Sequence, residues 1–139
     1  MNITDVDTEE ELEGYHDRLV EIFKRQTRLE EKYKDIEIKN GALVLPLPLD
    51  VHTFQGQVRI KDLIFRIADE LFESSNCLRN KAWKTTHVAT DEAHFREELI
   101  DGFHFYVQLF IELGMSAEDV YQLYCKKNKV NQFRQGSNY

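Results

Sequence analysis

Apolar positions recur along most of this chain at alternating spacings of three and four residues, the period of an amphipathic α-helix. Two capping boxes, Thr8 with Glu11 and Ser116 with Asp119, mark helix starts, and Gly114 is suited to end a helix. The predicted helices cover about 8–33, 57–78, 90–113 and 117 onward. We therefore predict an all-α helical bundle of four to five helices.

Residues 35–55 interrupt the helical pattern. A small β-hairpin over residues 36–45 would use Asn40-Gly41 as its turn. Pro46 and Pro48 then favour an extended chain. An ordered loop covering one end of the domain explains the same residues, and the pattern does not decide between the two.

Composition limits the classes of protein to which the chain belongs. Its 139 residues, 42% hydrophobic and 31% charged, suit a single folded domain over residues 1–139. The net charge of −7, from 18 basic and 25 acidic residues, argues against nucleic acid as a partner. The two cysteines, the acidic N-terminal stretch and the absence of a long apolar run predict a cytoplasmic protein without a membrane partner.

Two acidic pairs carry the most specific chemistry. Glu70 with Glu73, and Glu98 with Asp101, are each spaced three residues apart on two separate predicted helices, so each pair shares a helix face. If the helices pack side by side, four carboxylates converge and repel one another unless a cation lies among them. Oxygen ligands suit Mg²⁺ or Mn²⁺. A single helical glutamate is usually just solvated, but the paired spacing beside apolar stripes weakens that interpretation.

Three other side chains are candidates for contacting a ligand. Gln26 lies on the apolar stripe of the first helix, where an amide serves either helix packing or a base edge. Trp83 stands between Lys81 and Lys84, an improbable setting for a deeply buried tryptophan. His104 lies on an aromatic helix, where a histidine more often belongs to a hydrogen-bonded core.

The last helix carries a polar face in its second half. Lys127, Asn128, Asn131 and Arg134 follow one side of it. Alone, this face is typical of a solvated basic tail. Opposite a carboxylate-bound Mg²⁺ it would bind phosphates.

Together these motifs resemble the dimeric all-α dUTPases, within the MazG-like all-α nucleoside-triphosphate pyrophosphohydrolases. The family's metal signature Glu-x-x-Glu … Glu-x-x-Asp matches the two acidic pairs, and its Lys-x-Trp-Lys block matches residues 81–84. The sequences Asp101-x-x-His104-Phe105 and Gln26-x-x-Leu29 are also similar to family motifs. The run 127–139 resembles the family's C-terminal motif, with Asn138 in place of a glycine. The run 98–118 is similar to short phage enzymes that act on both dCTP and dUTP.

The resemblance implies a homodimer with shared sites, in a bacterial or phage-infected host cytoplasm. It implies hydrolysis of dUTP, and of dCTP if the base pocket allows, to the monophosphate and pyrophosphate. Two or more Mg²⁺ ions, replaceable by Mn²⁺, would be held by Glu70, Glu73, Glu98 and Asp101, with Glu73 as general base. The implied phosphate-binding residues are Lys127, Asn128, Asn131, Arg134, Tyr139, Lys81 and Lys84. The implied base and sugar contacts are Gln26, Trp83 and His104.

Two other classes of function are compatible with parts of the sequence. A non-catalytic regulator that binds nucleotide or protein would need neither all four acids nor the basic C-terminal motif. A purely structural bundle would leave its acids solvated, which conflicts with acids among the aromatics of the third helix. Mg²⁺-dependent pyrophosphate release separates the enzyme from both alternatives.

Overall fold

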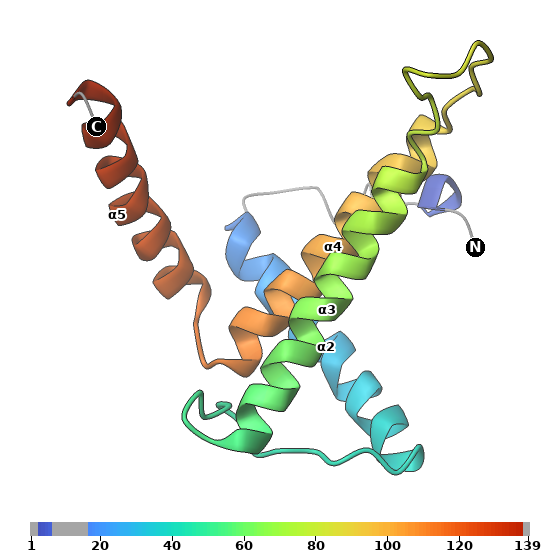
Figure 1. Ribbon diagram of the computed structural model, residues 1–139. Helices are drawn as coiled ribbons and strands as arrows, with labels where there is room; N and C mark the ends of the chain where they lie inside the picture. Colours follow the sequence, from blue (N-terminus) through green and yellow to red (C-terminus); the bar gives the residue numbers. More distant parts are fainter. Residues whose placement is uncertain (1–2, 7–16, 138–139) are drawn as a thin grey trace.

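The computed structural model describes residues 3–6 and 17–137, and in this part of the chain the fold is entirely helical (Figure 1). A short 3₁₀ helix, η1 (Ile3–Asp5), precedes the α-helices. These are α2 (Arg18–Lys39), α3 (Phe54–Asn76), α4 (Glu92–Glu112) and α5 (Ala117–Gly136). The predicted all-α class is confirmed. None of the described helices has the length and apolar content needed to cross a membrane.

Side-chain caps fix where the helices begin. The Asp91 carboxylate accepts a hydrogen bond from the His94 amide at 3.0 Å and starts α4. At α5, Ser116 and Asp119 cap each other's backbone amides, so the predicted capping box is confirmed. The predicted box of Thr8 and Glu11 lies outside the described residues. The described part of α2 begins after Asp17, whose carboxylate accepts from the Val20 amide.

The predicted β-hairpin over residues 36–45 is wrong. Residues 36–39 form the last turn of α2, and the Asn40 amide donates to the Ile36 carbonyl at 3.0 Å, which continues the helical bonding. Residues 42–53 then form an ordered connection without a strand. The Leu49 amide donates to the Glu112 carbonyl at 2.7 Å and thereby ties this connection to the end of α4. The alternative of an ordered loop covering one end of the domain is the correct one.

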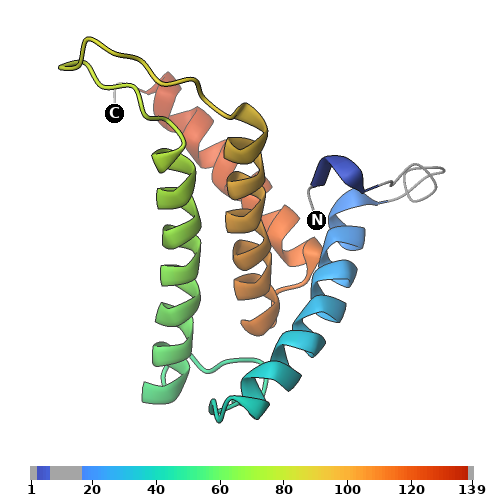
Figure 2. The same ribbon diagram turned by 90° about the vertical axis from the view of Figure 1, so that its right-hand side faces the viewer.

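The helices α3 and α4 lie side by side and antiparallel, and α2 packs against α4 (Figure 2). Leu63 of α3 is fully buried. A hydrophobic cluster of Phe23, Val107 and Ala117 joins α2, α4 and the start of α5. Because α3 and α4 run together over their length, acidic residues near the end of one helix and the start of the other come together.

Beyond its first turn, α5 diverges from the other helices (Figure 1). Gly114 makes the preceding turn with φ of +77°, and a β-carbon there would lie 2.9 Å from Pro48. Large aromatic side chains of α5 are exposed, among them Tyr124 (67%) and Phe133 (75%). On α3, Phe72 is 68% exposed. Exposed aromatic side chains are common in protein–protein contacts.

Candidate metal centre

Three carboxylates converge where α3 and α4 lie side by side. Glu70 and Glu73 of α3 and Glu98 of α4 each offer an oxygen, and these atoms all lie within 4.8 Å of one another. Glu98 is buried, Glu70 is partly buried and Glu73 is exposed. Solvent exposure therefore increases across the site, from the buried Glu98 on α4 to Glu73, which is open to water.

Asp101 lies outside this group of three, although it follows Glu98 by one turn of α4. Its negative charge nevertheless contributes to raising the pKa of both Glu70 and Glu73. Asp101 is therefore electrostatically coupled to the two acids of α3, as Glu98 is.

The electrostatics of the cluster favour a bound cation. Partial burial, a hydrogen bond with Glu98 and the neighbouring carboxylate charges raise the pKa of Glu70 to about 7. A hydrogen bond with Glu98 and its charge raise the pKa of Glu73. Close carboxylates resist joint ionisation unless a cation neutralises them. An all-oxygen donor set of this charge fits Mg²⁺ or Mn²⁺ and does not favour a thiolate- or imidazole-preferring metal.

His94 is a neighbour of the cluster that the sequence analysis did not select. Its Nε2 atom lies 3.2 Å from a Glu98 carboxylate oxygen. The signal was present in the spacing, because residues four apart on a helix lie on the same face.

Gln26 and His104 meet between α2 and α4. The Gln26 Oε1 atom lies 2.8 Å from His104 Nδ1, and Gln26 is only 3% exposed. The Gln26 Nε2 atom has no hydrogen-bond partner among the described residues. Gln26 therefore takes part in helix packing and still keeps an unused donor.

The connection between α3 and α4 carries Trp83. This tryptophan is 78% exposed, and the Lys81 ammonium lies 5.5 Å from its ring centroid. The connection leaves α3 shortly after Glu73 and reaches α4 shortly before Glu98, so it lies at the carboxylate end of the helix pair (Figure 2). Lys84 belongs to the same exposed connection.

The predicted phosphate-binding residues of α5 are not brought to the carboxylates within one chain. Lys127, Asn128, Asn131 and Arg134 lie on the exposed second half of α5, which diverges from α3 and α4 (Figure 1). Tyr139 lies outside the described residues.

Comparison with known proteins identifies the family. The sequence matches the dUTPase family over residues 18–116 and 106–139. The chain belongs to the dUTPase family. This dUTPase-family chain is 37% identical to the dCTP pyrophosphatase of Enterobacteria phage T4 over 70 residues, 42% of the chain and 41% of that protein. It is 49% identical to the dCTP pyrophosphatase of Enterobacteria phage LZ5 over 49 residues, 35% of the chain and 28% of that protein.

A third similarity is to a DNA replication protein of phage T4, at 37% identity over 60 residues, 35% of the chain and 15% of that protein. The chain therefore spans less than half the length of each of these relatives. No solved structure matches the chain.

Proposed function

We propose that this chain is a Mg²⁺-dependent pyrophosphatase of dCTP and dUTP that releases the nucleoside monophosphate and pyrophosphate. The observation that carries the proposal is the convergence of Glu70, Glu73 and Glu98 between α3 and α4. Membership of the dUTPase family supports it, as do relatives named dCTP pyrophosphatase.

The carboxylates of the cluster would have two roles, metal binding and proton transfer. Glu70, Glu98 and Asp101 would hold two or more Mg²⁺ ions together with Glu73. Mg²⁺ bound there would neutralise phosphate charge and lower the pKa of a nearby water. Glu73 is the exposed member of the cluster. As general base it would accept a proton from the attacking water. The water oxygen would form a bond to the α-phosphorus, the bond between that phosphorus and the α–β bridging oxygen would break, and pyrophosphate would leave with the bonding electrons.

We further propose that the active form is a homodimer. The second half of α5 diverges from its own carboxylates, and its aromatic side chains are exposed (Figure 1). A second copy packed against this surface would cover those aromatics and bring one protomer's α5 to the other's carboxylates. The phosphate-binding residues would then be Lys127, Asn128, Asn131, Arg134 and Tyr139, assisted by Lys81 and Lys84.

The nucleoside would bind beside the carboxylates. Gln26 keeps a donor next to His104, which lies one turn after Asp101 on α4. Trp83 provides an exposed aromatic face at the same end of the helix pair. Base and sugar would contact these three side chains.

The test is pyrophosphate release by purified protein with dCTP, dUTP, dTTP or dATP, each with Mg²⁺, Mn²⁺ or EDTA. We expect Mg²⁺-dependent turnover of dCTP and dUTP, and its loss in Glu73→Gln. A protein that binds dCTP with Mg²⁺ but turns over none of the four would instead be a regulator on the same fold.

A further inference from the structure

Glu98 is the most buried of the three converging carboxylates, and its side chain is only 9% exposed. Carboxylates that hold a metal are usually oriented by hydrogen bonds from neighbouring side chains, which fix the direction of their oxygens. Glu70 and Glu73 also interact with Glu98, but both belong to the proposed ligand set themselves. A side chain that orients Glu98 independently of the metal therefore has to come from outside the set of three.

His94 contacts Glu98 from outside this set. Its Nε2 atom lies 3.2 Å from the Oε1 atom of Glu98, which is within hydrogen-bonding distance. Among the described residues, the oxygens that lie within 4.8 Å of one another belong to the three glutamates, and His94 is not a member of the group. Imidazole is also not a preferred ligand of Mg²⁺. His94 is thus positioned to act on a ligand and not to be one.

The local structure of α4 directs the two side chains together. Glu98 follows His94 by four positions, so the two residues share a helix face. Helical side chains lean toward the N-terminus of their helix, which directs Glu98 toward His94. The Asp91 carboxylate accepts a hydrogen bond from the His94 amide at 3.0 Å, and the Asp91 carbonyl accepts one from the Phe95 amide at 3.0 Å. The backbone that carries His94 is therefore fixed by the cap of α4.

We propose that His94 is a positioning residue of the metal centre, an inference that rests on the proposed function. Its imidazole donates from Nε2 to Glu98 and holds that carboxylate in the orientation that binds Mg²⁺. A glutamate side chain loses much rotamer freedom when it is fixed. A contact that orients the carboxylate before the metal arrives reduces this cost and raises the affinity for the metal.

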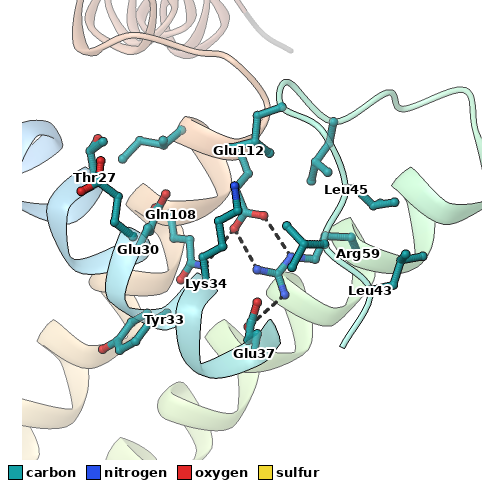
Figure 3. A pocket seen from close by; sticks show the side chains of 15 residues that line it. Thr27, Glu30, Tyr33, Lys34, Glu37, Leu43, Leu45, Arg59, Gln108 and Glu112 are labelled. Carbon is teal, nitrogen blue, oxygen red and sulfur yellow. Dashed lines mark hydrogen bonds and ion pairs between the residues drawn. The ribbon is translucent and has the colours of Figure 1, made fainter. Parts of the chain in front are cut away.

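The other end of α4 shows which substitution should preserve this contact. There the Gln108 Nε2 atom donates to the Glu112 Oε2 atom at 2.8 Å, again with four positions between the two residues (Figure 3). A glutamine thus reaches the carboxylate of a glutamate at this spacing on the same helix. His94→Gln keeps an uncharged donor within reach of Glu98, whereas His94→Leu removes the donor and keeps an apolar side chain. Because the His94 side chain is 54% exposed, neither change removes a core contact.

The test is titration of the protein with Mn²⁺ alone, with the free ion measured by electron paramagnetic resonance. The matched control is His52→Leu, which replaces an exposed histidine in the connection before α3, at the other end of that helix from Glu73. We expect His94→Leu to weaken Mn²⁺ binding by at least about tenfold, since loss of a side chain that orients a ligand typically costs 10–100-fold. His94→Gln and the control should remain within about threefold of wild type.

Turnover of dCTP at increasing Mg²⁺ concentration gives a second measurement. His94→Leu should need at least about tenfold more Mg²⁺ for half-maximal turnover and should then reach the kcat of wild type. A general loss of structure would lower kcat at every Mg²⁺ concentration, and that result would overturn the positioning role.

The outcomes separate this proposal from the proposed function. Unchanged Mn²⁺ affinity in His94→Leu would overturn the role of His94 and leave the enzyme standing. His94→Gln binding Mn²⁺ as weakly as His94→Leu would overturn the hydrogen-bond assignment. Wild type that binds Mn²⁺ without turning over any triphosphate would refute the proposed function, and the Mn²⁺ affinities would still decide the role of His94. If His94→Leu does not fold, His94→Ala, with the strongest helix-forming residue, takes its place with the same expected loss.

Discussion

The Nδ1 atom of His104 lies 2.8 Å from Oε1 of Gln26, although the two residues are 78 positions apart in the chain. This contact joins α2 to α4 one turn after Asp101 along α4. It shows that Gln26 is a packing residue whose amide oxygen is engaged. Its amide nitrogen is unpaired among the described residues, which leaves a donor for a base or sugar.

Replacing Gln26 with Leu should weaken nucleotide binding more than folding. The variant loses both the His104 contact and the unused donor, and we expect KM for dCTP and dUTP to rise about tenfold, the cost of about one good hydrogen bond. Circular dichroism and steady-state kinetics measure the two effects. Gln55→Leu, at an exposed position early in α3, is the control. Equal KM values in Gln26→Leu and wild type would restrict Gln26 to packing.

Metal binding should be visible in thermal stability. Without metal, Glu70→Gln removes one of the converging negative charges, so its Tm in EDTA should exceed that of wild type. With Mg²⁺ at about one hundred times its Kd, wild type should gain about 3 kcal/mol, whereas Glu70→Gln should gain much less. Differential scanning fluorimetry measures both. Glu97→Gln, on α4 outside the cluster, is the control, and a wild-type Tm indifferent to Mg²⁺ would contradict the site.

The fold was largely predictable because helix period and capping residues are local signals. Ser116 and Asp119 cap each other as predicted, and α3 and α4 begin and end within a few residues of the predicted limits. For residues 36–45 the sequence allowed either a β-hairpin or an ordered loop, and the hairpin prediction was wrong. Its β-branched residues favour a strand locally, but hydrogen bonding at the end of α2 and docking of Leu49 on α4 decide the outcome.

The candidate site was only partly predictable, for a physical reason. Helical spacing places Glu70 with Glu73, so the acidic pairs were found. His94 becomes significant only because its ring lies beside Glu98 one turn away, and a single solvated histidine has the same sequence pattern. The position of α5 relative to the carboxylates depends on packing between helices, which no spacing within α5 encodes.

Arg59 should be a major stabilising residue. Its guanidinium donates to both Glu112 oxygens, at 3.0 and 3.2 Å, and lies 3.4 Å from Glu37. The Glu112 side chain is only 9% exposed, so Arg59→Met would leave a buried carboxylate without its cation, hydrogen-bonded to Gln108, and cost about 3 kcal/mol of unfolding free energy. Urea denaturation measures this cost.

Arg96 provides the matched control for that measurement. It pairs with Glu92 one turn away, but both side chains are about 70% exposed, at 72% and 70%. Arg96→Met should change stability by less than about 0.5 kcal/mol, because surface ion pairs are weak. Similar costs at Arg59 and Arg96 would contradict a major stabilising role for the contact of Arg59 with Glu112.

Glu30 should make stability depend on pH. Its folded pKa of about 8 lies above the ordinary value of 4.5, so its contribution is full below pH 4.5 and is lost as pH rises through 8. Glu30→Gln does not titrate, and its stability relative to wild type should therefore increase between pH 5 and pH 8.5. Because Glu30 is partly exposed, solvent screening reduces the expected gain to on the order of 1 kcal/mol. Urea denaturation at the two pH values that shows an equal difference would refute the raised pKa.

The most direct test of the central claim is the identity of the bond that is broken. ³¹P NMR of dCTP and dUTP incubated with the protein and Mg²⁺ should show nucleoside monophosphate and pyrophosphate appearing together. The same spectra with Glu73→Gln or with EDTA should show unreacted triphosphate. Inorganic phosphate with the nucleoside diphosphate, or triphosphate unchanged by wild type in Mg²⁺, would contradict a carboxylate-based pyrophosphatase.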